Sequence, residues 1–256
     1  MNNVQKVVKF QLADYRLAII IFYIASMGMI SMIAMSVVRS NASGSGIEES
    51  TISGFEIGAV ILLFILALST FSETFKMMLQ NGITRRIMFK GFLMTTLIMS
   101  VGMTLINEII LFVGGILTSN HKNIIYKGIF EQIYWTRYAQ RSGNMQMAIE
   151  GMLFLICLLA VSMAFGYLIT TIFYRLNAYA KVAVAVSVPV MIIVVLPLLD
   201  YFLTEGAILG AIGEFILFSF GIKNGYNPYY GMISLTISYG LFTALSWVIV
   251  RGAEIK

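Results

Sequence analysis

Charged side chains are scarce in this chain of 256 residues. Aspartate, glutamate, lysine and arginine make up 11% of the sequence, whereas 59% of the residues are hydrophobic. This balance does not describe a soluble surface and instead indicates an integral membrane protein. The net charge of +5 is therefore no sign of nucleic-acid binding, because its meaning depends on where the cations lie along the chain.

Cysteine and histidine are almost missing as well. The one cysteine, Cys157, excludes an internal disulfide, and the one histidine, His121, leaves no His/Cys cluster for a metal site. The sequence contains no GxxxxGK[ST] phosphate loop, so this chain does not bind ATP in the P-loop manner. It also has no nucleophile elbow, HExxH motif or paired catalytic carboxylates. We therefore expect no enzyme activity and no cofactor or metal bound by this chain.

Long apolar runs make up most of the sequence and predict an all-α integral membrane protein with six transmembrane helices. The first run, 17–38, is long enough at about 1.5 Å per residue to cross a hydrocarbon core of roughly 30 Å. The other five spans are expected at 54–75, 87–117, 151–174, 182–199 and 229–250. Pro189 and Pro197 are expected to kink or end the fifth.

Residues 1–16 are too polar to cross a bilayer, yet they carry an apolar stripe. Apolar side chains recur there at helical spacing, while lysine and arginine take the other side. The apolar members are Val4, Val8, Leu12 and Tyr15. This pattern predicts an amphipathic helix lying at the interface of the cytoplasmic leaflet. The alternative is a basic leader that only orients the first span.

Two further segments interrupt the spans. The apolar run 206–221 is short for a crossing, so we expect a re-entrant segment that dips in from outside before the last span. The long polar segment 119–146 is expected to be an outer loop. Its aromatic residues at i, i+4 spacing predict an interfacial helix that either anchors at the membrane surface or contacts substrate. With six spans both termini are cytoplasmic, and most of the 17 cations then lie inside, as the positive-inside rule requires.

The charged turn 76–86, between the second and third spans, is the most distinctive stretch. Gly82 suits the left-handed conformation that closes a helix, and Thr84 suits the N-cap of the next one, with Ile83 and Met88 at the positions of a hydrophobic staple. A partner protein could grip and push this tip. Alternatively, its cations only anchor two spans. The residues expected to contact a partner are Lys76, Gln80, Asn81, Gly82, Ile83, Thr84, Arg85 and Arg86.

Glu108 is the clearest ionisable residue within a predicted span. A charge at the centre of a membrane helix costs about 2.5–3.5 kcal/mol on insertion scales, so this side chain should face protein or a water-filled cavity. It could line a translocation path or gate, or it could be hydrogen-bonded or protonated against a neighbouring helix. Glu214, in the re-entrant run, raises the same two possibilities.

Taken together, these features resemble the ABC-2 type permease subunits of bacterial ABC exporters. The shared features are the N-terminal amphipathic helix, six spans, the turn Gln-Asn-Gly-Ile-Thr-Arg-Arg between spans two and three, and the re-entrant stretch before the last span. The small stand-alone permeases of Gram-positive bacteria, including those that export cytolytic or antimicrobial peptides, resemble this chain most in layout. The resemblance covers most of the chain at the level of layout, and the turn is its one local motif.

The resemblance implies a type V ABC transporter in the bacterial cell membrane, built from a permease homodimer and two separate ATPase subunits that bind ATP and magnesium. Residues 76–86 would be the coupling helix, 1–16 the interfacial helix, and 206–221 the closure of the exit. The expected function is export of an amphipathic or hydrophobic substrate, above all a peptide. The alternatives are an ATP-independent secondary transporter or channel and a peptide-sensing membrane immunity protein.

Overall fold

The computed structural model describes most of the chain, but parts of the predicted outer loop lie outside the described residues. The described ranges are 3–42, 50–117, 124–138 and 145–252. Five helices in these ranges are long and apolar enough to cross a membrane, and the number becomes six if both parts of one bent helix form a single span. The chain is therefore a helical, multi-pass membrane protein by the length and composition of its helices, as the sequence predicts.

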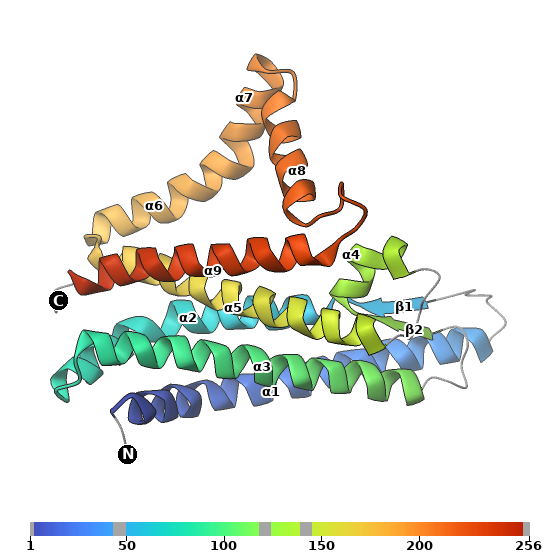
Figure 1. Ribbon diagram of the computed structural model, residues 1–256, viewed down its shortest axis with the longest axis horizontal. Coiled ribbons are helices and arrows are strands. Elements are labelled where there is room, and N and C mark those ends of the chain that lie inside the picture. Colours follow the sequence, from blue (N-terminus) through green and yellow to red (C-terminus); the bar gives the residue numbers. More distant parts are fainter. Residues whose placement is uncertain (1–2, 43–49, 118–123, 139–144, 253–256) are drawn as a thin grey trace.

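Five long helices form one bundle (Figure 1). They are α1 (Asn3–Ala42), α2 (Phe55–Gln80), α3 (Arg85–Leu117), α5 (Met145–Arg175) and α9 (Pro228–Arg251). The helix α5 packs extensively on α2 and on α9, while α1 packs along α3. The start of α1, the end of α9 and the α2–α3 turn lie together at the left of Figure 1. We call this the hairpin end of the bundle, and the opposite end, which carries two short strands, the sheet end.

A stripe of small residues lets α5 approach α2 closely. The hydroxyls of Ser162 and Thr170 donate hydrogen bonds to backbone carbonyls of α2 at 2.6 and 3.0 Å, in both cases to a residue 102 positions earlier. Midway between them, a Cβ on Gly166 would lie only 2.5 Å from the Phe64 carbonyl oxygen. The two helices therefore run in the same direction at constant register, with their backbones in contact through small side chains.

Residues 3–42 form one continuous helix, which corrects the prediction of a separate interfacial helix over 1–16. No proline or glycine interrupts the first 27 residues, so nothing in the local sequence ends the helix at residue 16. The apolar stripe faces protein: Val8 and Tyr15 are buried, while Val4 and Leu12 are half-buried. An apolar stripe indicates only that some apolar surface covers it, and here that surface is largely the bundle.

The contacts between α1 and α3 keep one register over several turns. Thr95 Oγ1 donates a hydrogen bond to Gln11 Oε1 at 2.7 Å, and the Tyr23 hydroxyl donates to Asn107 Oδ1 at 3.0 Å. Both pairs are 84 residues apart, so α1 and α3 run parallel. The amide of Gln11, a polar group in a predicted membrane-surface helix, is thus buried and hydrogen-bonded inside the bundle.

The sheet end contains two elements that an all-α prediction does not include. The strands β1 (Ser50–Ser53) and β2 (Ile124–Lys127) pair in parallel, with Ile52 opposite Tyr126. They join the connection after α1 to the connection after α3. The short helix α4 (Ile129–Tyr138) follows β2, and it confirms the helix expected within the outer loop 119–146. Its aromatic residues Phe130, Tyr134 and Tyr138 face inward.

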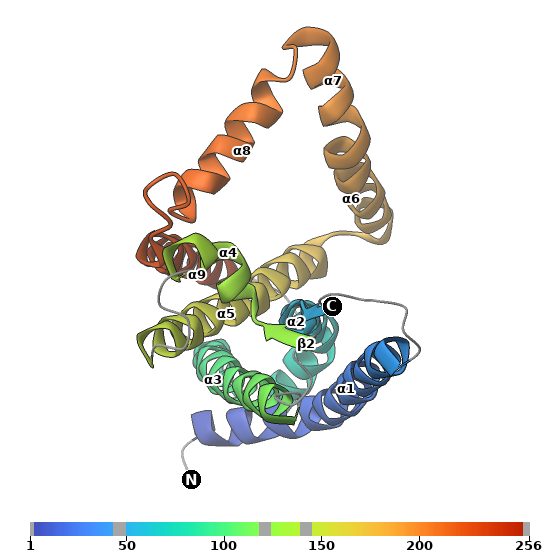
Figure 2. The same cartoon turned by 90° about the vertical axis from the view of Figure 1, so that its right-hand side faces the viewer.

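An arm leaves the bundle between α5 and α9 (Figures 1 and 2). It consists of α6 (Ala178–Val190), the π-helical turn η1 (Met191–Val195), α7 (Leu196–Leu203) and α8 (Ala207–Ser219). The first three form one apolar stretch, 178–203, which includes the predicted fifth span. Pro189 lies inside α6, directly before the π-helical turn. A proline removes one backbone donor and commonly disturbs a helix in this way.

The predicted re-entrant run corresponds to α8, a short apolar helix. It lies outside the bundle and runs from the tip of the arm back toward α9 (Figure 1). Asp200 holds the turn that precedes it. This side chain is 1% exposed and accepts hydrogen bonds from the Thr204 hydroxyl and from the backbone N–H groups of Ile208, at 2.8 Å, and Leu209, at 3.2 Å. A carboxylate at the first turn of a helix satisfies backbone donors that otherwise have no partner. The tip of the arm is therefore a closed, hydrogen-bonded corner.

Candidate functional site

The turn at the hairpin end has the local geometry that its sequence predicts. Gly82 has a φ of +75°, and the N–H groups of Gly82 and Ile83 donate backward to carbonyls at the end of α2, both at 3.0 Å. This pair of bonds is a Schellman closure, for which glycine is the favoured residue. Thr84 Oγ1 accepts the N–H of Ile87 at 3.4 Å and so acts as the N-cap of α3. Ile83 and the buried Met88 both join the main core.

The helix α2 changes direction shortly before this turn. Its parts 55–71 and 73–80 are bent by 45° relative to each other, so the last two turns point away from the line of the span (Figure 1). The residues exposed at the tip come from the end of α2, from the turn itself and from the first turn of α3. They are Gln80, Asn81, Gly82, Thr84 and Arg86, while Lys76, Ile83 and Arg85 are half-buried.

The two arginines of the turn have different surroundings. Arg85 Nη1 donates a hydrogen bond to the Arg251 carbonyl oxygen at the end of α9, at 2.7 Å, while Arg86 is exposed. Arg175, from the end of α5, donates in the same way to the Gly252 carbonyl oxygen at 2.6 Å. Two cations thus satisfy carbonyls at the negative end of the α9 dipole. Both arginines are among the residues predicted to contact a partner, but Arg85 also ties the turn to α9, which the sequence does not reveal.

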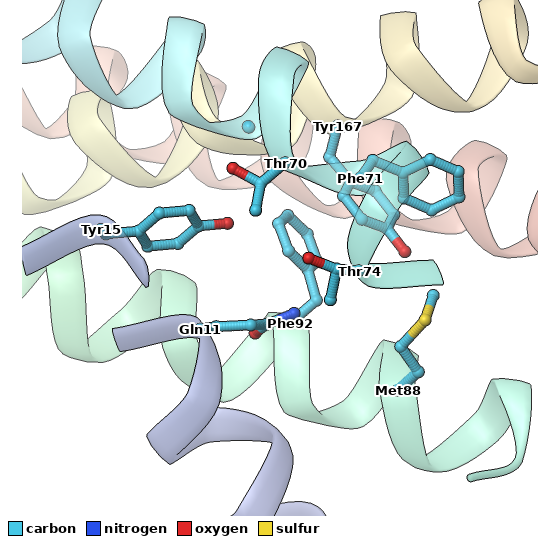
Figure 3. Close-up of a pocket in the computed structure, with 9 residues that line it drawn as sticks. Gln11, Tyr15, Thr70, Phe71, Thr74, Met88, Phe92 and Tyr167 are labelled. Carbon is cyan, nitrogen blue, oxygen red and sulfur yellow. The ribbon is translucent and has the colours of Figure 1, made fainter. Parts of the chain in front are cut away.

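A small polar cavity lies beside the bend of α2, between α1, α2, α3 and α5 (Figure 3). Its volume is about 10 Å³. Thr70 and Thr74 lie on either side of the bend, and the Tyr15 hydroxyl interacts with Thr70. The complete lining consists of Gln11, Tyr15, Ala67, Thr70, Phe71, Thr74, Met88, Phe92 and Tyr167. Polar groups from three helices therefore meet where α2 changes direction.

Replacing Tyr167 by phenylalanine is expected to raise the midpoint of thermal unfolding. Its hydroxyl is buried and has no hydrogen-bond partner among the described residues, and an unsatisfied buried polar group costs about 1–3 kcal/mol. The control is Tyr23→Phe, which removes a hydroxyl bonded to Asn107 at 3.0 Å and should lower the midpoint. The measurement is a melting curve of purified protein in detergent. A lower midpoint for Tyr167→Phe would contradict the prediction and indicate that water in the cavity hydrates the hydroxyl.

A second, larger cavity lies at the sheet end, with a volume of about 420 Å³. Three carboxylates line it, from three different elements: Glu56 in the first turn of α2, Glu108 in α3 and Glu131 in the first turn of α4. Apolar and aromatic side chains form much of the remaining wall, among them Leu111, Phe112, Tyr126, Phe130, Met145 and Met147. The structure thus places Glu108 on a cavity, as one of the two sequence interpretations requires.

Each carboxylate of this cavity has a different environment. Glu56 is buried and accepts the backbone N–H of Ile129 at the start of α4. Glu108 and Glu131 are half-buried. Burial raises the pKa of the Glu131 carboxyl above its ordinary value, although the Gly128 N–H and the nearby Lys127 act in the opposite direction. Carboxylates that line one cavity repel one another when all are ionised, so the cavity favours a protonated carboxyl or a cationic group among them.

A buried carboxylate, Glu150, connects α4, α5 and α9 beside this cavity. It is 3% exposed and accepts hydrogen bonds from the Tyr138 hydroxyl, from the Tyr229 hydroxyl at 2.9 Å and from Gln146 Nε2 at 2.8 Å. Burial together with the bond to this carboxylate raises the pKa of the Tyr138 hydroxyl. Phe130, Tyr134 and Tyr138 pack against Phe154 and Leu235, so the aromatic series predicted to anchor at the membrane surface fixes α4 to the bundle.

The other predicted gate residue, Glu214, lies elsewhere. It sits on α8 of the arm, where its carboxylate is 2.8 Å from Lys223 Nζ and its side chain is 70% exposed. It does not line the cavity that contains Glu108. Sequence reasoning missed Glu56, Glu131 and Glu150 because all three fall at or beyond the ends of predicted spans, where a carboxylate is ordinarily solvated. The glycine and the aromatic residues at 126–130 were the sequence feature that could have indicated that this connection packs against the bundle.

Within the described ranges, no group of three or more histidine, cysteine, aspartate or glutamate side chains has a geometry that could hold a metal ion. Comparisons of the chain with protein-family models, with curated proteins and with solved structures gave no match.

Proposed function

We propose that this chain is the membrane-spanning permease subunit of an ATP-driven ABC exporter that moves amphipathic or hydrophobic substrates, above all peptides, out of a bacterial cell. The chain itself would catalyse no reaction, because ATP and magnesium bind to a separate ATPase subunit. The working unit would be a permease homodimer with two such ATPases. Both termini and the α2–α3 turn would then lie in the cytoplasm. The observation that carries the proposal is the bent end of α2 with its exposed, cationic tip.

The bend makes the tip a suitable surface for a partner that moves. The section 73–80 departs by 45° from the rest of α2, and its closure on α3 is fixed by Gly82 and Thr84. A force on this tip acts on two helices at once, because the Schellman closure and the N-cap leave little freedom between them. The exposed Arg86 offers an ATPase a charge to pair with.

Movement of the tip has two routes into the bundle. Arg85 connects the turn directly to the end of α9 through the hydrogen bond to the Arg251 carbonyl. Through α3, the turn also connects to α1, by hydrogen bonds that keep one register, and at the far end to Glu108 on the cavity at the sheet end, which would be the outer side. A displaced tip would therefore reach the helix that follows the arm and the helix that lines the cavity.

The outer cavity provides the chemistry for a substrate. Its carboxylates would attract the amino groups or basic side chains of a peptide, and its aromatic and methionine side chains would contact apolar ones. An amphipathic peptide combines both kinds of group. The same cavity would also serve a peptide-sensing immunity protein without ATP, which is why the partner rather than the substrate decides between these functions.

The decisive experiment is co-expression of the chain with its neighbouring genes, followed by purification and an ATPase assay in lipid nanodiscs. We expect a stable complex with a P-loop ATPase whose hydrolysis rate responds to amphipathic cationic peptides. A control omits the chain and measures the ATPase alone. If the chain purifies without any ATPase yet binds such peptides, the exporter proposal is wrong and the sensing function replaces it.

A further inference from the structure

A groove runs between α1 and α3 near the hairpin end. It consists of two adjoining hollows of about 300 and 430 Å³. Gln5 and Met94 line both hollows, so the two lie side by side along the same pair of helices. One wall is formed by residues of the first turns of α1, and the other by residues of the first turns of α3. The apolar members of the two walls are Val4, Val8, Leu12, Leu93, Met94 and Ile98.

The floor of the groove is apolar and faces away from the bundle. Met94 and Ile98 are 53% and 47% exposed, so the described part of the protein leaves them uncovered. From Lys90 to Ile98, the α3 wall is about 12 Å long at a rise of roughly 1.5 Å per residue. A hydrocarbon chain could lie along this length. In a membrane, the acyl chains of the surrounding lipids are the obvious source of such a chain.

The groove also carries positive charge on both walls. Lys9 of α1 lines one hollow and Lys90 of α3 lines the other. Both are exposed, and neither forms an ion pair with a carboxylate within the described ranges. Lys6 is exposed on the same turns of α1, whereas the nearest acid in this part of α1, Asp14, lies more than one turn further on. Two unpaired ammonium groups beside an apolar channel complement a ligand with an anionic head and an apolar tail.

We propose that this groove binds an anionic phospholipid, with the phosphate between Lys9 and Lys90 and one acyl chain over the apolar walls. A membrane supplies such lipids at the depth where the groove opens, and lysines close to the bilayer attract them electrostatically. Long lysine side chains can reach headgroups while their stems lie on apolar surface. The inference requires only that the chain resides in a membrane, so it does not depend on the exporter proposal.

Native mass spectrometry in detergent tests this site, with phosphatidylglycerol or phosphatidylcholine of identical acyl chains as the probe. We expect phosphatidylglycerol to bind more tightly. The variant Lys9→Gln with Lys90→Gln should weaken its binding about 25-fold, because each lysine near an anionic surface contributes roughly fivefold. Phosphatidylcholine binding should not change. The matched control, Lys76→Gln with Lys181→Gln, removes the same charge outside the groove and should bind phosphatidylglycerol like the unaltered protein.

A second variant tests the apolar part of the site. Replacing Met94 by tryptophan fills the floor and should reduce binding of both lipids, and a melting curve of each variant establishes that it is folded. Equal affinity for the two lipids, or phosphatidylglycerol binding that the paired lysine variant leaves unchanged, would overturn the proposal. If Met94→Trp leaves lipid binding unchanged but changes the mass of the assembled complex, the lipid proposal is overturned and the groove instead receives a second copy of the chain or another protein.

Discussion

Replacing Arg86 by glutamate is expected to lower substrate transport about tenfold or more while ATP hydrolysis by the partner continues. The side chain is exposed at the tip of the α2–α3 turn, where an ATPase would grip the permease. Removing one partner of a charge pair that is buried in a protein interface costs about 2–5 kcal/mol, and reversing the charge adds repulsion. The measurement is peptide uptake into inside-out vesicles, with ATP hydrolysis followed in the same sample.

The neighbouring arginine provides the matched control. Arg85→Ala removes the hydrogen bond to the Arg251 carbonyl and should lower the midpoint of thermal unfolding, because a charge-assisted bond contributes about 1.5–3 kcal/mol. Arg86→Glu should leave that midpoint unchanged. If transport survives Arg86→Glu at its normal rate in a complex that still contains the ATPase, the tip is not the coupling surface.

These two residues also show what the sequence can and cannot predict about the hairpin. Gly82 and Thr84 act through atoms within five residues of themselves, so backbone preferences alone predict the turn correctly. The partner of Arg85 lies 166 residues further along the chain. No local pattern carries that information, and the prediction therefore assigned both arginines the same role.

The N-terminal segment illustrates a different limit. Its apolar stripe was predicted correctly as helical, since spacing determines which residues share a face. The same spacing does not say whether lipid or another helix covers that face. The pairing of Gln11 with Thr95 could be recognised only once α1 was known to run beside α3.

The cavity at the sheet end was predictable only in part. Glu108 was identified because a carboxylate within an apolar run requires an explanation. Glu56 and Glu131 join it through the fold: the parallel pairing of β1 with β2 brings the start of α2 next to the start of α4. Strands of four residues in polar connections carry almost no sequence signal, so the all-α prediction omitted them and the acidic cavity with them.

The backbone contact between α5 and α2 also escaped prediction, although its signal is present in the sequence. Ser162, Gly166 and Thr170 recur every four residues along α5 and form the stripe that lies against α2. The sequence has other glycines at the same spacing, such as Gly206 and Gly210, which have no atom near an added Cβ. Small residues at this spacing permit close packing but do not identify which stripe is used.

Replacing Gly166 by alanine is therefore expected to destabilise the protein, although alanine is the better helix former. The new Cβ would lie 2.5 Å from the Phe64 carbonyl oxygen, a backbone atom that cannot rotate away. Overpacking of this kind costs about 1–3 kcal/mol. The hydrogen bonds of Ser162 and Thr170 to α2 would lengthen as the two helices separate, which adds to the loss. We expect a midpoint of thermal unfolding lower by roughly 2–12 °C, at about 2–4 °C per kcal/mol for a chain near this size.

The same substitution in α3 supplies the control. A Cβ on Gly102 would have no atom within 4 Å, so Gly102→Ala should gain the helix propensity of alanine, up to about 1 kcal/mol, and raise the midpoint. Opposite signs for one chemical change would demonstrate that backbone contact between α2 and α5 causes the loss. Equal and small shifts for both variants would instead mean that α5 does not approach α2 so closely, and the parallel register of Ser162 and Thr170 on α2 would then be wrong as well.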